Sequence, residues 1–503
     1  MKIPTLAAAL FLVACTPAKA PSPWAHEWMR LESDHFVLVT DQSRGDAEAA
    51  LRTMEEVHYV LSTSLLPGDD DTLKIQLVGF RQRDAFEAFA RRGAHAFVAR
   101  LWQDDGPTIV YADAATGETR ETMTHELVHA MLARRFVTLP TWFNEGFAEY
   151  ASTVEVRGGH AYFGRSIAGA DRFIGSGMPS LSSLLRMKPA EFYARRDDEH
   201  HDLRYDERVS LASHYVGAWA AVHMFQTGPE EYRPRFASYV DALHGGASHD
   251  AAWARAFGDV PMAALEKAYG EHLARRFGIT WRTPLEERPY RGRMKASPLG
   301  QGEGELLHAK LLLVRGDAKG ALARVQAAVQ REPTSVPALL ALARVSKPEE
   351  RRGVLARALA LAPDDPDVLD AYYHDLVRAR PAGQPPSDEE VEVLGRFTQS
   401  ARTAHHFNQV AWAKAQLGSL AVGLAFAKKA VAMDPTCYAC FDTLAFVLHA
   451  RGDLAGALSH QRRAAALVPE GVRDPEVEQR LEQFEREARG EAEEQPRRGA
   501  NAR

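Results

Sequence analysis

The first quarter of the chain alternates between short apolar runs and amphipathic runs. Residues 33–41 (SDHFVLVTD) and 73–80 (LKIQLVGF) are short, rich in β-branched residues and bounded by polar positions, a pattern typical of strands. Residues 47–61 carry apolar side chains three and four positions apart, which predicts an amphipathic helix. One more helix and two more strands are predicted, in that order, at 83–92, 94–102 and 107–113. The pattern turns helical at about Glu121 and is expected to stay helical to about Leu285, which indicates an α+β domain with a small N-terminal sheet.

The last third of the chain repeats its small residues every 34 positions. Gly418 and Gly452 are 34 residues apart (452 − 418 = 34). The same distance separates three further pairs: Ala411 and Ala445, Ala430 and Ala464, Pro435 and Pro469. An earlier copy keeps the phase 102 residues upstream, three times 34, with Gly316, Ala321, Ala328 and Pro333. The spacing resembles the tetratricopeptide repeat, so we expect an all-α solenoid of about five repeats over 305–485, with a concave surface for a protein partner.

Two segments lack apolar periodicity. Residues 286–304 are rich in Gly, Pro and basic residues, which predicts a linker between an N-terminal domain over 28–285 and the solenoid. Residues 486–503 carry charges of both signs, which predicts a disordered tail.

The N-terminal end predicts the location of the protein. Lys2 precedes a short apolar stretch that ends in Leu-Val-Ala-Cys at Cys15, which resembles the lipobox of bacterial lipoproteins. The resemblance implies a signal peptide over 1–14, a lipidated Cys15, a tether over 15–27 and attachment to the bacterial cell envelope. Thr16 after the cysteine implies the outer membrane, facing the periplasm. An ordinary signal peptide that contains a cysteine is the alternative.

Composition and charge exclude several classes of protein. With 503 residues, 46% hydrophobic and 25% charged, the chain is neither a disordered protein nor a polytopic membrane protein, and its length allows about three domain-equivalents. The 61 Lys and Arg against 67 Asp and Glu give a net charge of −6, so a nucleic-acid partner is not expected.

The chemistry-bearing motif is His-Glu-Leu-Val-His at 125–129, in a segment that reads as a helix. Residues four apart share one helix face, so His125 and His129 can direct imidazole nitrogens at one Zn²⁺, with Glu126 beside them to take a proton from water. A short loop before Thr141 lets a second helix return and set Glu145, in Asn-Glu-Gly, against the motif. This predicts a His₂Glu site for one zinc per chain, with an open fourth position.

This pair of motifs resembles the gluzincin metallopeptidases, and its short spacing is most similar to the bacterial "peptidase MA-like" group, including proteins with the domain of unknown function 1570. The resemblance implies a zincin-like α+β fold over about 28–278. It also implies that Glu149 hydrogen-bonds a ligand imidazole. Tyr215 is implied as the donor to the oxyanion, with His214 as the reserve and core packing as the alternative for Tyr215.

Two interpretations of function follow. The first is a lipid-anchored zinc metallopeptidase, weakly favoured as an endopeptidase, whose solenoid recruits a protein or peptide substrate or a partner. The alternative is a non-catalytic lipoprotein scaffold with a structural or vestigial zinc site. Hydrolysis of another envelope polymer also stays open.

Two other pairs of residues are candidate sites. His200 and His201 are expected to lie in a solvated loop, with a second metal as the alternative. Cys437 and Cys440 form a Cys-x-x-Cys pair, for which a disulfide, redox exchange and simple packing within a repeat are open, packing being favoured.

Overall fold

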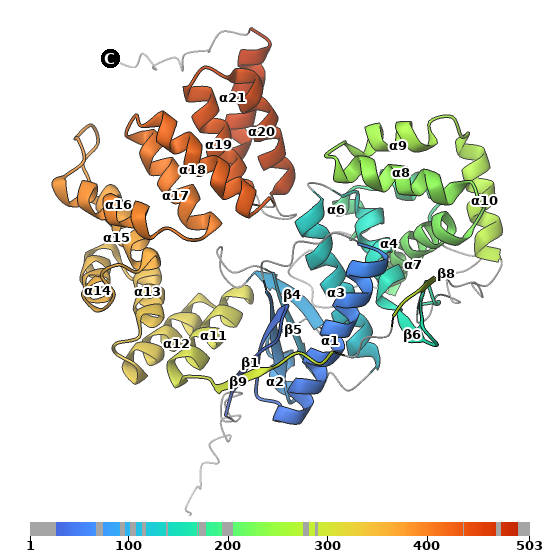
Figure 1. Ribbon diagram of the computed structural model, residues 1–503, viewed down its shortest axis with the longest axis horizontal. Coiled ribbons are helices and arrows are strands. Elements are labelled where there is room, and N and C mark those ends of the chain that lie inside the picture. Colours follow the sequence, from blue (N-terminus) through green and yellow to red (C-terminus); the bar gives the residue numbers. More distant parts are fainter. Residues whose placement is uncertain are drawn as a thin grey trace, which may run out of the picture.

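The structure is a computed structural model, and it has two parts, a mixed α/β domain and a helical solenoid (Figure 1). The described residues are 27–66, 74–90, 96–100, 107–112, 117–136, 139–167, 170, 178–193, 205–274, 281–286, 290–435, 437–468 and 474–490. The predicted signal peptide, Cys15 and the chain beyond residue 490 lie outside them. Among the described residues, no helix combines the length and the apolar character needed to cross a membrane.

The N-terminal domain is built on a six-stranded mixed sheet in the order β4-β5-β3-β2-β1-β9. Strands β2, β3 and β5 are parallel, whereas β4, β1 and β9 pair antiparallel with their neighbours. The strands are β1 (Met29–Glu32), β2 (Phe36–Thr40), β3 (Ile75–Phe80), β4 (Ala96–Arg100), β5 (Pro107–Ala112) and β9 (Lys295–Pro298). The four strands predicted from the apolar runs, β2 to β5, are confirmed.

Both faces of this sheet are covered by helices. In β3, Leu77 belongs to the large core of the domain, whereas its neighbour Val78 belongs to a smaller core on the opposite face. Successive strand residues point to opposite faces, which explains this division. The large core includes residues of α1 (Arg44–Ser64) and α3 (Gly117–Arg135). The smaller core includes Phe86 of α2 (Arg83–Glu87) and Leu311 of α11 (Gln301–Val314), the first helix of the solenoid.

The second half of the N-terminal domain is mainly helical and carries the aromatic core. Trp142 packs against Phe225 and stacks on Tyr239, and Trp142 is fully buried. The helices are α4 (Thr141–Ser152), α5 (Leu181–Arg186), α6 (Pro189–Phe192), α7 (Tyr205–Thr227), α8 (Tyr232–His244), α9 (His249–Phe257) and α10 (Met262–Ala274). This packing fixes α4 against α7 and α8, and so fixes the residues that α4 presents.

This half is mostly helical, as expected, but it also contains strands that the pattern did not predict. A second, three-stranded sheet has the order β6-β7-β8, with β6 (Glu155–Arg157), β7 (His160–Phe163) and β8 (Trp281–Pro284). Gly158 and Gly159 join β6 to β7, and both have positive φ, 56° and 71°, as a two-residue hairpin turn requires. The pattern failed to show β6 because every residue of that strand is exposed, so no buried face marks it.

The expected linker over 286–304 is also partly wrong. Its residues Lys295–Pro298 form β9, which pairs antiparallel with β1, and α11 begins at Gln301. All four residues of β9 are exposed, which is why an edge strand here resembles a linker in sequence. The solenoid therefore starts directly from the edge of the sheet.

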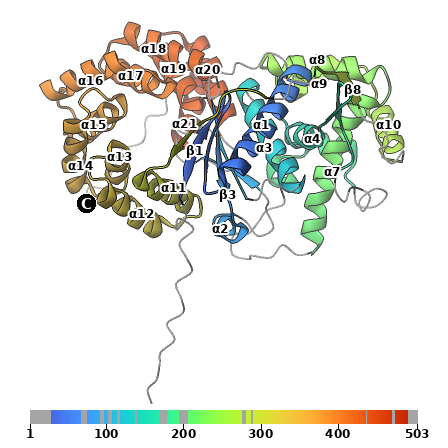
Figure 2. The same ribbon diagram turned by 60° about the horizontal axis from the view of Figure 1, so that its bottom comes forward.

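From α11 onward the chain is an array of helix pairs, as the 34-residue spacing predicts. The helices are α11, α12 (Ala318–Arg331), α13 (Val336–Val345), α14 (Pro348–Leu361), α15 (Pro366–Ala379), α16 (Asp388–Ser400), α17 (Ala404–Gln416), α18 (Leu420–Met433), α19 (Tyr438–Ala450), α20 (Leu454–Leu467) and α21 (Pro475–Ala488). They make five pairs and a final helix, α21, which extends three residues into the segment expected as a disordered tail. The array forms an arc (Figure 2).

The periodic residues have the structural roles that their spacing implies. Gly316, Gly418 and Gly452 end the first helix of their pairs with φ of 78°, 77° and 86°, the left-handed conformation that favours glycine. The periodic alanines are completely buried where two helices meet: Ala321, Ala328, Ala411, Ala430, Ala445 and Ala464. The solenoid part of the predicted fold is therefore confirmed at the level of a tetratricopeptide-type helical repeat.

Candidate metal centre

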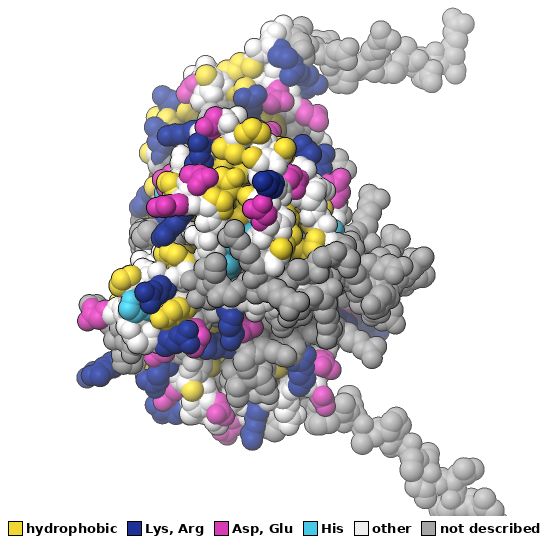
Figure 3. Space-filling model, turned by 90° about the vertical axis from the view of Figure 1, so that its right-hand side faces the viewer, with side chains coloured by type: hydrophobic (Ala, Val, Ile, Leu, Met, Phe, Trp, Pro, Cys, Tyr) yellow, Lys and Arg dark blue, Asp and Glu magenta, His cyan; other side chains and the backbone are white. Residues whose placement is uncertain are grey.

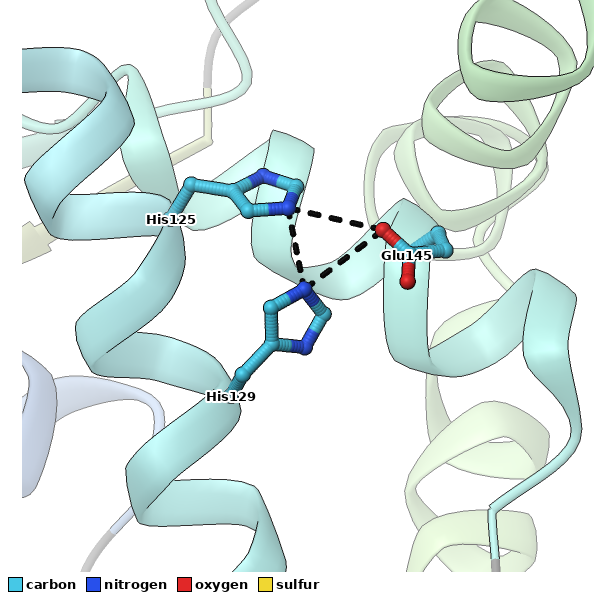
Figure 4. A group of neighbouring side chains, drawn as sticks. All are labelled: His125, His129 and Glu145. Atoms are coloured by element: carbon cyan, nitrogen blue, oxygen red, sulfur yellow. Dashed lines mark hydrogen bonds and ion pairs between the residues drawn. The ribbon is translucent and has the colours of Figure 1, made fainter. Parts of the chain in front are cut away.

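Two helices bring together the residues that the sequence predicts as metal ligands. His125 and His129 lie one turn apart on α3, and Glu145 lies in the second turn of α4. α3 ends at Arg135 and α4 begins at Thr141, so the short connection reverses the chain and packs α4 against α3. The three side chains converge on one point, as Figure 4 shows.

The spacing of the three ligand atoms fits a zinc ion. The Nε2 atoms of His125 and His129 are 2.9 Å apart, and Oε2 of Glu145 lies 3.4 Å from the first and 3.5 Å from the second. Ligands about 2.0–2.1 Å from a tetrahedral Zn²⁺ are about 3.3 Å from one another. Among the described residues, these three form the group of His, Cys, Asp or Glu side chains suited to hold a metal ion.

The charges around the centre favour a cation. Burial lowers the pKa of His125, but the nearby carboxylates, Glu149 first and then Glu145, outweigh burial and raise that pKa to about 9. The charge of Glu126 acts in the same direction. Burial raises the pKa of Glu145, yet the charge of His129 and the hydrogen bond from His125 hold it well below its usual range. A buried carboxylate that stays ionised beside two imidazoles is a site for a proton or a metal ion.

Each ligand histidine has a second partner on α4 that orients its ring. Asn144 Oδ1 accepts a hydrogen bond from Nδ1 of His129 at 3.2 Å. Glu149 Oε1 lies 3.5 Å from Nδ1 of His125, an ion-pair distance. With Nδ1 engaged, Nε2 of each ring is the nitrogen available to a metal. Glu149 therefore lies beside the imidazole of His125, and the hydrogen bond that the resemblance implies stays a prediction.

Tyr193 is a member of the site that sequence analysis missed. It follows α6, and its hydroxyl donates a hydrogen bond to Oε1 of Glu145 at 2.6 Å, while Oε2 of Glu145 faces the histidines. One carboxylate oxygen is thus held away from the metal position. No motif marks this residue, because it lies 48 positions from its partner and α6 has only four residues.

Helix α7 carries Tyr215, the residue that the resemblance implies as oxyanion donor. The ring of Tyr215 lies 6.5 Å from the ring of His125 between centroids, and Phe192 packs edge-on against it at 5.4 Å. The reserve candidate His214 instead has Nδ1 hydrogen-bonded to the backbone oxygen of Phe192 at 2.8 Å. The ring of Tyr215 thus lies close to a ligand histidine, whereas one nitrogen of His214 is engaged by the backbone at the end of α6.

Gly146 explains how α7 approaches the centre. A Cβ atom at Gly146 would lie 2.3 Å from the backbone oxygen of Ala218 on α7, far inside van der Waals contact. Only glycine permits this approach, and it follows Glu145 directly in the Asn-Glu-Gly motif. The glycine of the motif thus has a packing reason.

Three residues that the sequence singles out, His200, His201 and Cys15, are not among the described residues.

The surface of the molecule carries charges of both signs. On the described part of the face in Figure 3, Lys and Arg side chains are interspersed with Asp and Glu side chains.

Comparisons with known proteins find similarity in solved structures only. No protein family model matches the chain, and no curated protein matches it significantly. A thermophilic tetratricopeptide-repeat protein of Thermus thermophilus is 21% identical, covering 36% of this chain and 98% of its own, with a TM-score of 0.31. PilW, a type IV pilus biogenesis factor, is 17% identical over 38% of this chain and 94% of its own, with a TM-score of 0.30. PilF of Pseudomonas aeruginosa is 15% identical, covering 38% and 90%, with a TM-score of 0.29.

The helix pairs of α11 to α21 make this part of the chain a repeat solenoid. A solenoid presents an extended surface on which other proteins bind.

Proposed function

We propose that the chain is a zinc-dependent peptidase attached to a protein-binding scaffold. The observation that carries the proposal is the convergence of three ligand atoms, on His125, His129 and Glu145, at separations of 2.9 to 3.5 Å. In addition, Asn144 and Glu149 orient the two histidine rings, and Tyr193 binds the second carboxylate oxygen of Glu145. A chance cluster of two imidazoles and a carboxylate would not need these contacts. Two nitrogens and one oxygen are one of the donor sets that catalytic zinc sites use.

The residues around the ligands divide the chemistry among them. When bound, zinc would supply the Lewis acidity that activates water and polarises a carbonyl. Glu126 follows His125 on α3 and is half-buried, in range of the charge on His125, so it is the group to accept and return a proton. Tyr215 is the group to donate a hydrogen bond to developing negative charge on the substrate.

The proposed location follows from the N-terminal sequence. Cys15, in its lipobox-like context, would attach the protein to the cell envelope, with the outer membrane as the proposed site. The solenoid would hold a protein substrate or partner close to the metal centre, which raises its local concentration.

A non-catalytic scaffold is the second candidate function. The regular helix pairs favour it, because the solenoid has all that protein binding needs without any contribution from the metal centre. In that case the three ligands would bind zinc for stability alone, and Glu126 would have no chemical role.

Metal analysis combined with two variants separates the candidates. We expect about one zinc per chain in the wild type, retained in Glu126→Gln and lost in Glu145→Ala. Cleavage of a fluorogenic peptide library should fall about 10²–10⁴-fold in Glu126→Gln, because the proton acceptor is gone. Glu155→Gln, on the exposed strand β6, is the matched control and should change neither the zinc content nor the rate of cleavage.

The outcomes lead to different conclusions. If every protein except Glu145→Ala binds zinc, but wild type and Glu126→Gln cleave peptides at the same rate, the non-catalytic scaffold is the correct candidate. Folded wild-type protein that binds no added zinc overturns the metal site itself.

A further inference from the structure

A disulfide lies in the solenoid, at the start of α19. Cys437 and Cys440 are bonded, so the expectation that they are simply two packed small residues is incomplete. Cys440 is also packed, being fully buried beside Phe407 and Ala430. The bond therefore joins a core residue to the turn between α18 and α19.

This disulfide is poorly suited to be a structural staple. It closes a loop of only four residues, and the stabilisation from a disulfide falls as the loop that it closes becomes shorter. Helix α19 is held by its own buried side chains, among them Phe441, Leu444 and Ala445, which pack against neighbouring helices. The repeat should therefore keep its fold when the bond is opened.

The two sulfurs have unequal surroundings. Cys437 is half-buried, whereas Cys440 has no exposed surface. Cys437 is also the N-cap of α19, and its Sγ accepts the backbone N–H of Cys440 at 3.1 Å. The amide dipoles at a helix N-terminus stabilise a thiolate, and this contact is as useful to a free thiolate as to a disulfide sulfur. An accessible, stabilised first cysteine and a shielded second one are the arrangement that reversible exchange requires.

We propose that Cys437 and Cys440 form a thiol–disulfide exchange site whose co-reactant is a dithiol of a partner protein. A partner thiolate attacks Sγ of Cys437, which breaks the Cys437–Cys440 bond and releases the Cys440 thiolate, which takes up a proton. The second partner thiolate attacks the partner sulfur of this mixed disulfide and releases the Cys437 thiolate, held by the helix amides. The partner loses two electrons and gains a disulfide, and the pair gains two electrons and is reduced.

The first test uses the full chain with the substitution Cys15→Ala, so that Cys437 and Cys440 are its two remaining cysteines. The protein is equilibrated in mixtures of reduced and oxidised glutathione, quenched with acid and alkylated with a maleimide that shifts its gel mobility. We expect the pair to pass from oxidised to reduced within these mixtures, with an unchanged circular dichroism spectrum. A pair that stays oxidised in about 10 mM reduced glutathione, or a solenoid that unfolds on reduction, overturns the proposal.

The second test compares single-cysteine variants in the same background. At pH 7, Cys437 in Cys440→Ser should react with 5,5′-dithiobis(2-nitrobenzoate) at least about tenfold faster than Cys440 in Cys437→Ser. Equal rates in two folded variants contradict the proposed asymmetry. Circular dichroism identifies a variant that has unfolded, and the glutathione titration of the intact pair then decides the question.

Discussion

The two halves of this chain place their functional residues in opposite ways. In the N-terminal domain, the metal centre draws on α3, α4, the end of α6 and α7, so its residues are spread over about 90 positions, from His125 to Tyr215 (215 − 125 = 90). In the solenoid, each helix packs mainly against its neighbours along the chain, and the same small residues recur at each junction.

The difference teaches where a sequence reveals structure. A solenoid is approximately a sum of local units, so a change in one repeat acts mainly on that repeat and its neighbours. A centre built from distant segments depends on close packing between helices, so a steric clash at one helix contact shifts the metal ligands that those helices carry. Four predictions test this contrast, from the largest expected effect to the smallest.

Gly146→Ala should have the largest effect. The new Cβ atom would lie 2.3 Å from the backbone oxygen of Ala218, so α4 and α7 must separate. We expect the free energy of unfolding to fall by about 2 kcal/mol, measured by urea denaturation, and zinc binding to weaken with it. Gly270→Ala on α10 is the control, because a Cβ there meets nothing within 4 Å. Equal stability of the two variants would contradict the role assigned to Gly146.

Tyr193→Phe should act on the metal without changing the fold. It removes the hydrogen bond to Oε1 of Glu145, which frees that carboxylate to rotate. We expect the dissociation constant for zinc to rise about tenfold, measured by competition with a chelator. Tyr162→Phe on β7 serves as control, and a zinc affinity that is the same in both variants would show that Tyr193 does not orient Glu145.

His308, on α11, tests the junction between the two halves. Burial, with a smaller contribution from the charge of Arg324, lowers the pKa of His308 to about 3. The unfolded chain, with a histidine pKa near 6.5, binds a proton that the folded chain does not, so stability is lost as pH falls below about 6.5. The free energy of unfolding should fall by on the order of 1 kcal/mol between pH 7 and 5, and His308→Gln should reduce this fall. An unchanged pH dependence in the variant would assign the effect to other groups.

Within the solenoid, two glycines give opposite expectations. Gly418→Ala forces a side chain into a φ of 77°, which should lower the free energy of unfolding by about 1 kcal/mol. Gly353→Ala lies inside α14 with open space around it, so it should raise stability by up to about 1 kcal/mol. Calorimetry of both variants checks the pair, and a shift in the same direction would contradict the repeat-by-repeat view.

The sequence predicts those parts of the fold in which buried residues recur at regular spacing or in apolar runs. Strands β2, β3 and β5 are predicted because they lie inside the sheet and are rich in apolar residues, and the helix pairs because alanine and glycine recur every 34 residues. The short strands β6 and β9 are fully exposed and so leave no pattern. Their places follow from tertiary pairing, which sequence alone does not contain.

The same distinction applies to the site. His125, His129 and Glu145 could be predicted because helix periodicity and one short loop are enough to bring them together. Tyr193 could not, since its contact with Glu145 depends on how α6 lies across α4. Asn144 was adjacent to a predicted ligand, yet its bond to His129 depends on the exact rotation of α4 about its axis.

The strand β9 decides how this protein can be divided or extended. A cut between residues 286 and 294, inside the segment that the sequence suggests as a linker, removes β9 from β1 and uncovers the backbone edge of β1. An open edge of this kind invites pairing between molecules, so the isolated N-terminal fragment should aggregate. The first helix pair of the solenoid is fixed to the sheet through Leu311 of α11. Further repeats therefore cannot be added before this pair without uncovering that face of the sheet.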